Sequence, residues 1–201
     1  MLLQGWSVRF TGEVAVRRLV AVEMVSLDGV MGAPDGWAFP YNDREIEEVN
    51  AAWMAASDAL LLGRVTYEAF AAFWPDQPGG TPIVDYINSV AKYVVSTTLE
   101  EPLGWNNSSL IGGDVAEGVA ALKERDGKDI TIVGSDTLAR SMLRENLLDE
   151  LRLMVYPVVV GGGKRLFEGG GSPLKLELVR SKTFGNGVVS LDYRPAGERE
   201  D

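Results

Sequence analysis

Short apolar runs alternate with segments of helical periodicity along most of this chain. The run ALLLG at residues 59–63 is continuous in apolar side chains and short, which is typical of a central strand with both faces covered. Near the end, two strand-like segments are joined by Gly185-Asn186-Gly187, a strong hairpin signal. Alternation of strands and helices followed by strands predicts an α/β fold, with a mostly parallel central sheet and antiparallel strands at its C-terminal edge.

The expected elements can be given by residue range. We expect strands at 19–27, 59–63, 92–96, 108–112, 130–134, 148–160, 174–184 and 188–193, and helices at 44–56, 64–73, 82–91, 115–125 and 136–145. No linker or repeat divides the 201 residues, so we expect one domain over 1–201. Residues 1–17 are expected to form an N-terminal extension, either a short extra strand or a loose leader, and 195–201 a frayed tail.

Two absent residue types exclude several classes of chemistry. The chain has no cysteine and no histidine. A thiolate nucleophile, a Cys/His zinc site, a disulfide framework and a Ser-His-Asp triad are therefore impossible within one chain, and we expect no metal site. Any acid–base chemistry has to use Asp, Glu, Tyr, Lys or water.

The charge balance bears on partners and location. Nineteen Lys and Arg against 29 Asp and Glu give a net charge of −10, which argues against a nucleic-acid or anionic-membrane surface. An anionic ligand would need a local cradle of cations or backbone N–H groups. Because no window reaches the ~18 apolar residues of a membrane span and the first residues make a poor signal peptide, we expect a cytoplasmic protein.

Glycine and polar residues gather where predicted strands meet predicted helices, the places where ligands collect in open α/β sheets. No G-x-G-x-x-G follows a strand and no P-loop is present, which disfavours a standard Rossmann or P-loop site. Three junctions carry candidate anion-binding residues, each with a plain structural alternative such as helix capping or a turn. These residues are Gly63, Arg64 and Thr66; Ser96 and Thr97; and Gly134, Ser135 and Thr137.

A fourth junction follows the longest predicted strand. In VYPVVVGGGKRLF, the glycines at 161–163 come where the strand is expected to end, after a proline, and before Lys164 and Arg165. Glycine there either forms a turn or lets a ligand approach bare backbone. Four such junctions in one α/β chain favour a dinucleotide lying across the strand ends.

Taken together, these segments resemble the dihydrofolate reductase superfamily. The stretches VSLDGVM, LLGRVTYE, VGSDTL and LLDELRLMVYPVVVGGGKRLF are most similar to the branch related to the reductase domain of riboflavin-biosynthesis enzymes (RibD C-terminal-like), over about residues 18–194. The resemblance implies a three-layer α/β/α reductase domain that binds NADPH across the strand ends.

The resemblance also implies roles for the junction residues. The cofactor phosphates would be faced by Gly63, Arg64 and Thr66, and the adenosine 2′-phosphate by Ser96 and Thr97. The pyrophosphate would be held by Gly134, Ser135 and Thr137. The nicotinamide side would be formed by Gly161, Gly162, Gly163 and Leu166. The turn at 26–29 would border the nicotinamide and the substrate. Two details depart from the family pattern: Thr98 stands where an arginine often grips the 2′-phosphate, and Gly134-Ser135 replaces a double glycine.

The proton donor is harder to assign. Dihydrofolate reductases place a carboxylate near the start of the helix before the LLGRVTYE strand, which corresponds to Glu47 here, with Asp43, Glu45 and Glu48 nearby. A solvated, dipole-stabilised first turn explains these charges equally well. Asp28 is the second candidate acid, and a simple Asp-Gly turn is its alternative.

The resemblance implies an NADPH-dependent reductase that transfers hydride to a small heterocyclic or pyrimidine substrate. A ribosylaminopyrimidine phosphate of riboflavin synthesis and dihydrofolate are the two competing substrates. A non-catalytic dinucleotide-binding or sensing protein is the alternative from another class, because a fold does not by itself assign chemistry. A homodimer is the expected assembly.

Overall fold

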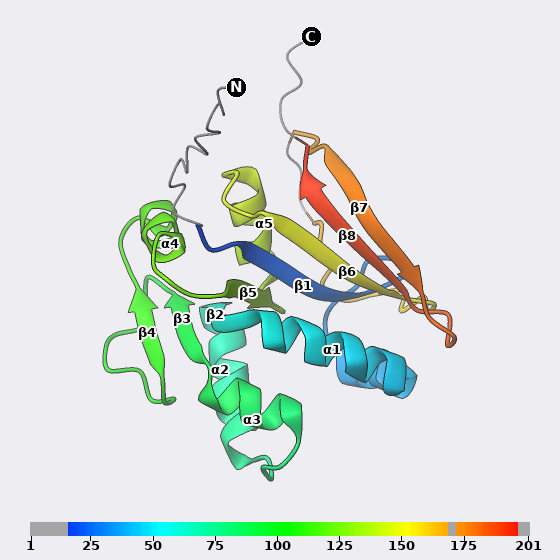
Figure 1. The fold of residues 1–201 in the computed structure, drawn as a ribbon, viewed down its shortest axis with the longest axis horizontal. Coiled ribbons are helices and arrows are strands. Elements are labelled where there is room, and N and C mark those ends of the chain that lie inside the picture. Colours follow the sequence, from blue (N-terminus) through cyan, green and yellow to red (C-terminus); the bar gives the residue numbers. More distant parts are fainter. Residues whose placement is uncertain (1–15, 169–171, 197–201) are drawn as a thin grey trace, which may run out of the picture.

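The computed structural model describes residues 16–168 and 172–196, and in this part of the chain eight strands form one sheet (Figure 1). The strands are β1 (Leu19–Ser26), β2 (Ser57–Gly63), β3 (Ala91–Val95), β4 (Ser108–Ile111), β5 (Asp129–Val133), β6 (Glu150–Tyr156), β7 (Leu176–Thr183) and β8 (Val189–Pro195). The helices are α1 (Arg44–Ala56), α2 (Arg64–Phe73), α3 (Pro82–Ser89), α4 (Val115–Lys123) and α5 (Asp136–Arg144), with short 3₁₀ turns at Pro34–Gly36, Phe39–Tyr41 and Trp74–Asp76.

The strand order is β4-β3-β2-β5-β1-β6-β8-β7. The first six strands in this order run parallel, and β8 is antiparallel both to β6 and to β7. This confirms the predicted fold class, a mostly parallel sheet with antiparallel C-terminal strands. Two strands interrupt the chain order: β5 lies between β1 and β2, and β8 lies between β6 and β7.

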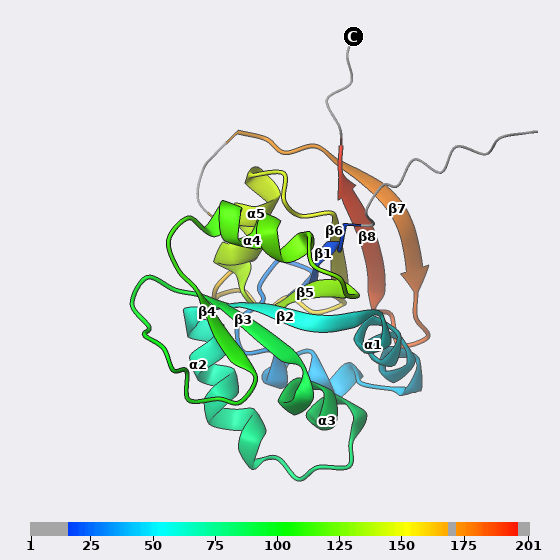
Figure 2. The same ribbon diagram turned by 60° about the vertical axis from the view of Figure 1, so that its left-hand side comes forward.

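Helices cover both faces of the sheet, which makes three layers. Figures 1 and 2 show α1, α2 and α3 on one face, and α4 and α5 on the other. Parallel crossovers are right-handed, so the direction in which the chain moves along the sheet decides the face on which its helix lies. The connections β1-α1-β2 and β2-α2-β3 run along the sheet toward β4. The connections β4-α4-β5 and β5-α5-β6 run in the opposite direction, so their helices lie on the other face.

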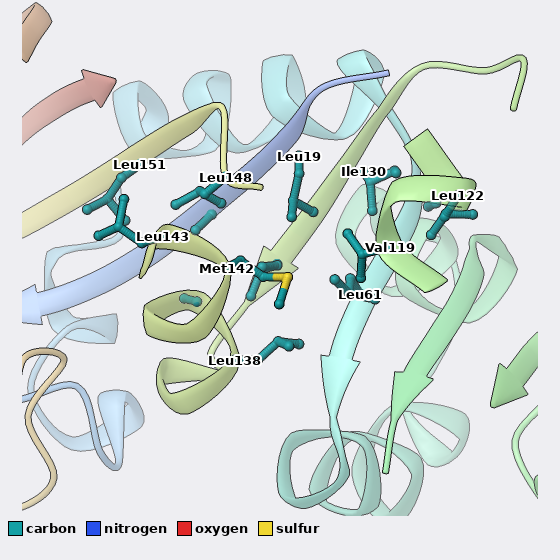
Figure 3. Packing of buried hydrophobic residues seen from close by; sticks show 14 residues of the cluster. Leu19, Leu61, Val119, Leu122, Ile130, Leu138, Met142, Leu143, Leu148 and Leu151 are labelled. Atoms are coloured by element: carbon teal, nitrogen blue, oxygen red, sulfur yellow. The ribbon is translucent and has the colours of Figure 1, made fainter. Parts of the chain in front are cut away.

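A buried cluster holds α4 and α5 against the sheet (Figure 3). Leu61, Ile130 and Leu19 come from three adjacent strands, while Met142 of α5 and Val119 of α4 cover them, and each is fully or almost fully buried. These side chains follow the period-2 pattern of strands and the 3.6 pattern of helices. Their burial fixes α5 over β5 and β1, which places the amino end of α5 at the strand ends.

Most predicted boundaries lie within two residues of the observed ones, but the end of β6 and the start of the frayed tail were wrong. β6 ends at Tyr156 rather than residue 160, because Pro157 has no N–H for the ladder, and Val159 and Val160 are exposed. The frayed tail does not begin at 195: Pro195 ends β8, and the Ala196 N–H donates to the carbonyl of Lys175 at 2.9 Å. Residues 197–201 lie outside the described residues.

The predicted N-terminal extension falls mostly on residues 1–15, which also lie outside the described residues. Its last residue, Arg17, is buried, forms an ion pair with Asp58 and donates to the Lys128 carbonyl at 2.7 Å. The ordered domain therefore begins before the first strand. Among the described residues, no helix has the length and apolar character needed to span a membrane.

The core cluster makes a direct prediction about stability. Leu61 is fully buried between the two helical layers, so Leu61→Ala should lower the free energy of unfolding by about 2–5 kcal/mol, measured by urea denaturation. Val65→Ala is the control: this side chain is 64% exposed on α2, and the change should stay within about 0.5 kcal/mol. A loss at Leu61 no larger than the control would contradict this packing.

Candidate functional site

The carboxyl ends of five parallel strands place the predicted junctions side by side. Along the sheet, Ser96 follows β3, Gly63 ends β2, Gly134 follows β5, the 26–29 turn follows β1, and the 157–168 segment follows β6. The register brings Val95 opposite Gly63 and Tyr156 opposite Ser26. The structure therefore gathers all four predicted junctions along one edge of the sheet.

The junctions after β2 and β5 are in direct contact. The Gly63 N–H donates to Ser135 Oγ at 3.0 Å, and Thr66 Oγ1 donates to the Gly134 carbonyl at 3.3 Å. α2 and α5 begin at these residues on opposite faces of the sheet. The amino ends of two helices, with their unpaired N–H groups and positive dipole ends, therefore meet at one point of the edge.

Glycine at two positions leaves the backbone between the two helix ends accessible. Gly134 has φ +68°, a conformation that glycine adopts readily, and a Cβ there would lie 3.6 Å from the Thr66 methyl group. A Cβ on Gly63 would lie 3.7 Å from Ser135 Oγ. Side chains at these positions would fill the space between the helix ends, so the glycines leave bare backbone where a phosphate group would approach.

The charge at this edge differs from the acidic average of the chain. Arg64 is exposed at the start of α2 and pairs with Glu68 at 2.8 Å. Asp136, at the start of α5, is buried between two cations, Lys164 at 2.5 Å and Arg140 at 3.0 Å. One carboxylate between two cations leaves a local positive charge beside the helix end, which suits an anion.

Asp28 ties the 26–29 turn to the segment after β6. Its Oδ1 accepts from Ser26 Oγ at 2.7 Å and from the Val160 N–H at 3.0 Å, and its Oδ2 accepts from the Gly161 N–H at 3.0 Å. Arg165 adds a contact at 3.6 Å to the carboxylate and donates to the Asp28 carbonyl at 3.0 Å. Asp28 and Arg165 therefore join the 26–29 turn to the 157–168 segment at the end of this edge, and we call these two joined segments the clasp.

These contacts do not fit Asp28 as a proton donor. Hydrogen bonds from Ser26 and Val160 hold the pKa of Asp28 at about 2, so this carboxylate is ionised at neutral pH. Asp28 lies in the turn after β1, and its contacts are those of a structural acceptor.

Glu47 does not fit the role of a buried acid either, because it lies exposed on the first turn of α1. The other acids of this turn make structural contacts. Asp43 caps α1 by accepting from the Ile46 N–H at 3.0 Å, and Glu45 accepts from the Gly185 N–H at 3.0 Å. Glu48 forms an ion pair with Arg44 at 3.0 Å. The first turn of α1 therefore anchors the β7–β8 hairpin, and family spacing alone was a poor guide to the acid.

The remaining predicted residues divide by exposure. Ser96 is buried, and its Oγ accepts from the Thr98 and Leu99 N–H groups at 3.1 and 3.0 Å, so it forms the ST-turn that was the structural alternative. The side chains or backbones that remain open to solvent are Thr97, Thr137, Gly161, Gly162 and Gly163. Leu166 is buried against Val25 and Met31 and supports the clasp from below.

One residue of this edge was not predicted from the sequence: Glu23 in β1. Its carboxyl group is fully buried, Oε2 accepts from the Gly134 N–H at 3.0 Å, and Oε1 has no hydrogen-bond partner among the described residues. Burial, and then the charge of Asp136, raise the pKa of Glu23 to about 8, so it is mostly neutral at pH 7. The signal was visible in the sequence as one acid inside the apolar run LVAVEMVS.

A separate hollow of about 520 Å³ lies at the opposite, amino ends of β3 and β4. It is lined by Ser89, Ala91, Leu103, Trp105, Asn106, Asn107, Ser108 and Ser109. None of the predicted site residues lines it. The strand edge with its two helix ends is therefore the candidate site.

The fold and this edge define an α/β domain in which the amino ends of two helices meet at the carboxyl ends of parallel strands. Residues 17–190 match the model of the RibD C-terminal domain, and the chain belongs to this family. It is 30% identical over 189 residues to the uncharacterized protein YyaP of Bacillus subtilis, covering 91% of this chain and 97% of that protein. YwjB of the same organism, also uncharacterized, is 30% identical over 179 residues, covering 88% and 97%.

Solved structures share the fold at lower identity. A putative riboflavin biosynthesis protein from Shewanella has a TM-score of 0.71 at 23% identity, covering 90% of this chain and 99% of its own. A pyrimidine reductase-like protein from Corynebacterium diphtheriae has a TM-score of 0.62 at 14% identity, covering 90% and 93%. RibD from Acinetobacter baumannii has a TM-score of 0.61 at 15% identity, covering 90% of this chain and 58% of its own.

Glu23 makes the stability of the protein depend on pH. Its folded-state pKa of about 8 lies above the ordinary value of 4.5, so the folded protein holds a proton that the unfolded chain releases between these values. The free energy of unfolding should therefore fall as pH rises from about 5.5 to 7.5, by up to about 1.4 kcal/mol per pH unit.

Glu23→Gln removes this titration, and its stability should be flatter over the same range when both proteins are unfolded in urea. Asp28, with a pKa of about 2, and Lys92, whose pKa burial lowers to about 8, contribute little slope inside this window. Equal slopes in the wild type and Glu23→Gln would contradict a buried neutral Glu23.

Proposed function

We propose that this protein is an NADPH-dependent reductase that acts on a small heterocyclic substrate of the pyrimidine type. The observation that carries the proposal is the meeting of the α2 and α5 amino ends at Gly63 and Gly134, joined by the 3.0 Å contact of the Gly63 N–H with Ser135 Oγ. Two helix ends and two glycines at one point suit a diphosphate group.

The order of the strand ends supports a whole dinucleotide rather than a lone phosphate. On one side of the β2–β5 point lies the exposed Thr97 after β3, where an adenosine end would lie. On the other side lie the 26–29 turn and the 157–168 segment, joined by Asp28 and backed by apolar Val25, Met31 and Leu166. An apolar backing suits the uncharged nicotinamide ring. Bound there, NADPH would supply the hydride.

The substrate class comes from the family. The chain belongs to the RibD C-terminal domain family, and the Corynebacterium relative of the same fold is described as pyrimidine reductase-like. Dihydrofolate is the weaker candidate, because the carboxylate expected at Glu47 is exposed. With Asp28 ionised as well, we infer that the substrate takes its proton from water or from its own substituents.

Binding is tested with Arg64. If this exposed cation contacts a cofactor phosphate, Arg64→Gln should weaken NADPH binding about 10-fold or more in a calorimetric titration, because hydrogen bonds to charged groups contribute about 1.5–3 kcal/mol. Arg44→Gln is a matched control, since Arg44 also forms an exposed pair with the acid four residues later, but on α1. Equal affinities of the two variants would contradict the proposed phosphate contact.

Catalysis is tested by following NADPH absorbance with a ribosylaminopyrimidine phosphate and with dihydrofolate in parallel. Oxidation with the pyrimidine alone supports the proposal, and oxidation with dihydrofolate alone supports the second substrate. Tight NADPH binding without oxidation by either compound would point to a dinucleotide-binding or sensing protein. Absence of binding by NADPH and by NADH would contradict every nucleotide function of this site.

A further inference from the structure

Glu23 has a feature that the proposed function does not use. Its carboxyl group lies directly beneath the Gly134–Ser135 turn and is fully buried. One oxygen accepts from the Gly134 N–H, and the other has no partner in the described part of the chain. An unpaired buried acid is costly, so its retention in an otherwise apolar strand calls for a physical reason.

We propose that Glu23 is a positioning residue of the ligand site, which in its neutral form holds the Gly134–Ser135 turn so that the first N–H groups of α5 face an anionic ligand. This inference rests on the proposed function and names its ligand group as the diphosphate of a dinucleotide. Glu23 acts through Gly134 and Ser135 and does not itself contact the ligand.

The contacts of Glu23 indicate which of its oxygens carries the proton in the neutral form that holds the turn. Oε2 accepts from the Gly134 N–H, so the proton of the neutral carboxyl group resides on Oε1, which has no partner within the described ranges. Held from below by Glu23, Gly134 keeps its φ of +68°, and its carbonyl accepts from Thr66 at the start of α2. One buried carboxyl group thus fixes the turn where α2 and α5 meet.

Ionisation of Glu23 would work against an anion at this site. A buried carboxylate would lie beside the bound phosphate and beside Asp136, whose charge already raises the Glu23 pKa. It would also draw water beneath the turn, because a bare buried charge is unstable without solvation. The neutral form is therefore the form that binds.

Other charges near Glu23 leave this account unchanged. On α5, Asp136 is held by Arg140, and by Lys164 from the segment after β6. Beyond the end of β1, Asp28 is ionised near pH 2 and stays so. The remaining charged groups of the strands on either side are at their amino ends, where Asp129 of β5 and Glu150 of β6 pair with Arg18, and Arg152 pairs with Glu150.

The test is the affinity for NADPH between pH 7 and pH 9, measured by calorimetry on the full chain. With a pKa of about 8, Glu23 is neutral in about nine molecules of ten at pH 7 and in about one of ten at pH 9. If only the neutral form binds, the apparent Kd of the wild type should rise about tenfold across this range.

Two variants separate positioning from a general structural role. Glu23→Gln keeps both hydrogen-bonding functions and cannot ionise, so it should bind as the wild type does at pH 7 and show a much smaller rise to pH 9. Glu23→Leu fills the space but leaves the Gly134 N–H unpaired, so it should bind several-fold more weakly at pH 7, with the same small pH dependence. Circular dichroism and urea unfolding check that both variants are folded.

The outcomes distinguish this inference from the proposed function. A Glu23→Gln profile as steep as that of the wild type would show that Glu23 is not the titrating group and would overturn the inference. So would a folded Glu23→Leu variant with wild-type affinity. Wild-type protein that binds no NADPH at pH 7 would instead contradict the proposed function, and the inference would fall with it.

Discussion

The position of β5 between β1 and β2 is the constraint on which the candidate site depends. β2 and β5 are adjacent, yet their chains leave in opposite directions, so right-handed crossovers send α2 and α5 to opposite faces of the sheet. Adjacent strands with diverging helices leave a crevice at their carboxyl ends, where open α/β sheets bind ligands. The site follows from this strand order and from the packing of Leu61, Ile130 and Met142 that holds α5 in place.

Several residues at this crevice adopt conformations or environments that do not favour folding. Gly134 adopts a left-handed conformation, and Asp136 is buried near Glu23. Glu23 itself is buried with one hydrogen-bond partner among residues 16–168 and 172–196. Burial of the two acids is unfavourable by itself, and the conformation of Gly134 excludes most other residues there. Gly134 and Asp136 lie in the same turn, and Glu23 reaches this turn from β1 through its hydrogen bond with the Gly134 N–H. Functional sites commonly concentrate such features, because the binding of a ligand requires backbone groups and charges that a simple core would exclude.

Much of the fold could be predicted from the sequence because local patterns specify it. The short apolar run of β2 and the turn at 185–187 are both signals carried by neighbouring residues. The end of β6 at Tyr156 was predictable in principle, since Pro157 interrupts the ladder, but the β-branched residues after it suggested a longer strand.

The site was predicted less completely, because its contacts join segments far apart in the sequence. The place of the four junctions at strand ends was predictable, whereas the pairing of Gly63 with Ser135 and of Asp28 with Val160 depends on strand order. Glu47 was placed by spacing within a family, and spacing does not reveal which face of α1 is exposed. Glu23 was not predicted, because an acid inside an apolar strand does not reveal which group it contacts.

The central claim is that a dinucleotide lies across the strand ends with its diphosphate between α2 and α5. A crystal structure with bound NADPH tests it most directly. The account predicts the diphosphate beside Gly63 and the Gly134–Ser135 turn, within hydrogen-bond distance of the first N–H groups of α2 and α5, and the nicotinamide beside the 26–29 turn. NADPH bound at another surface, with this edge unchanged, would contradict the account.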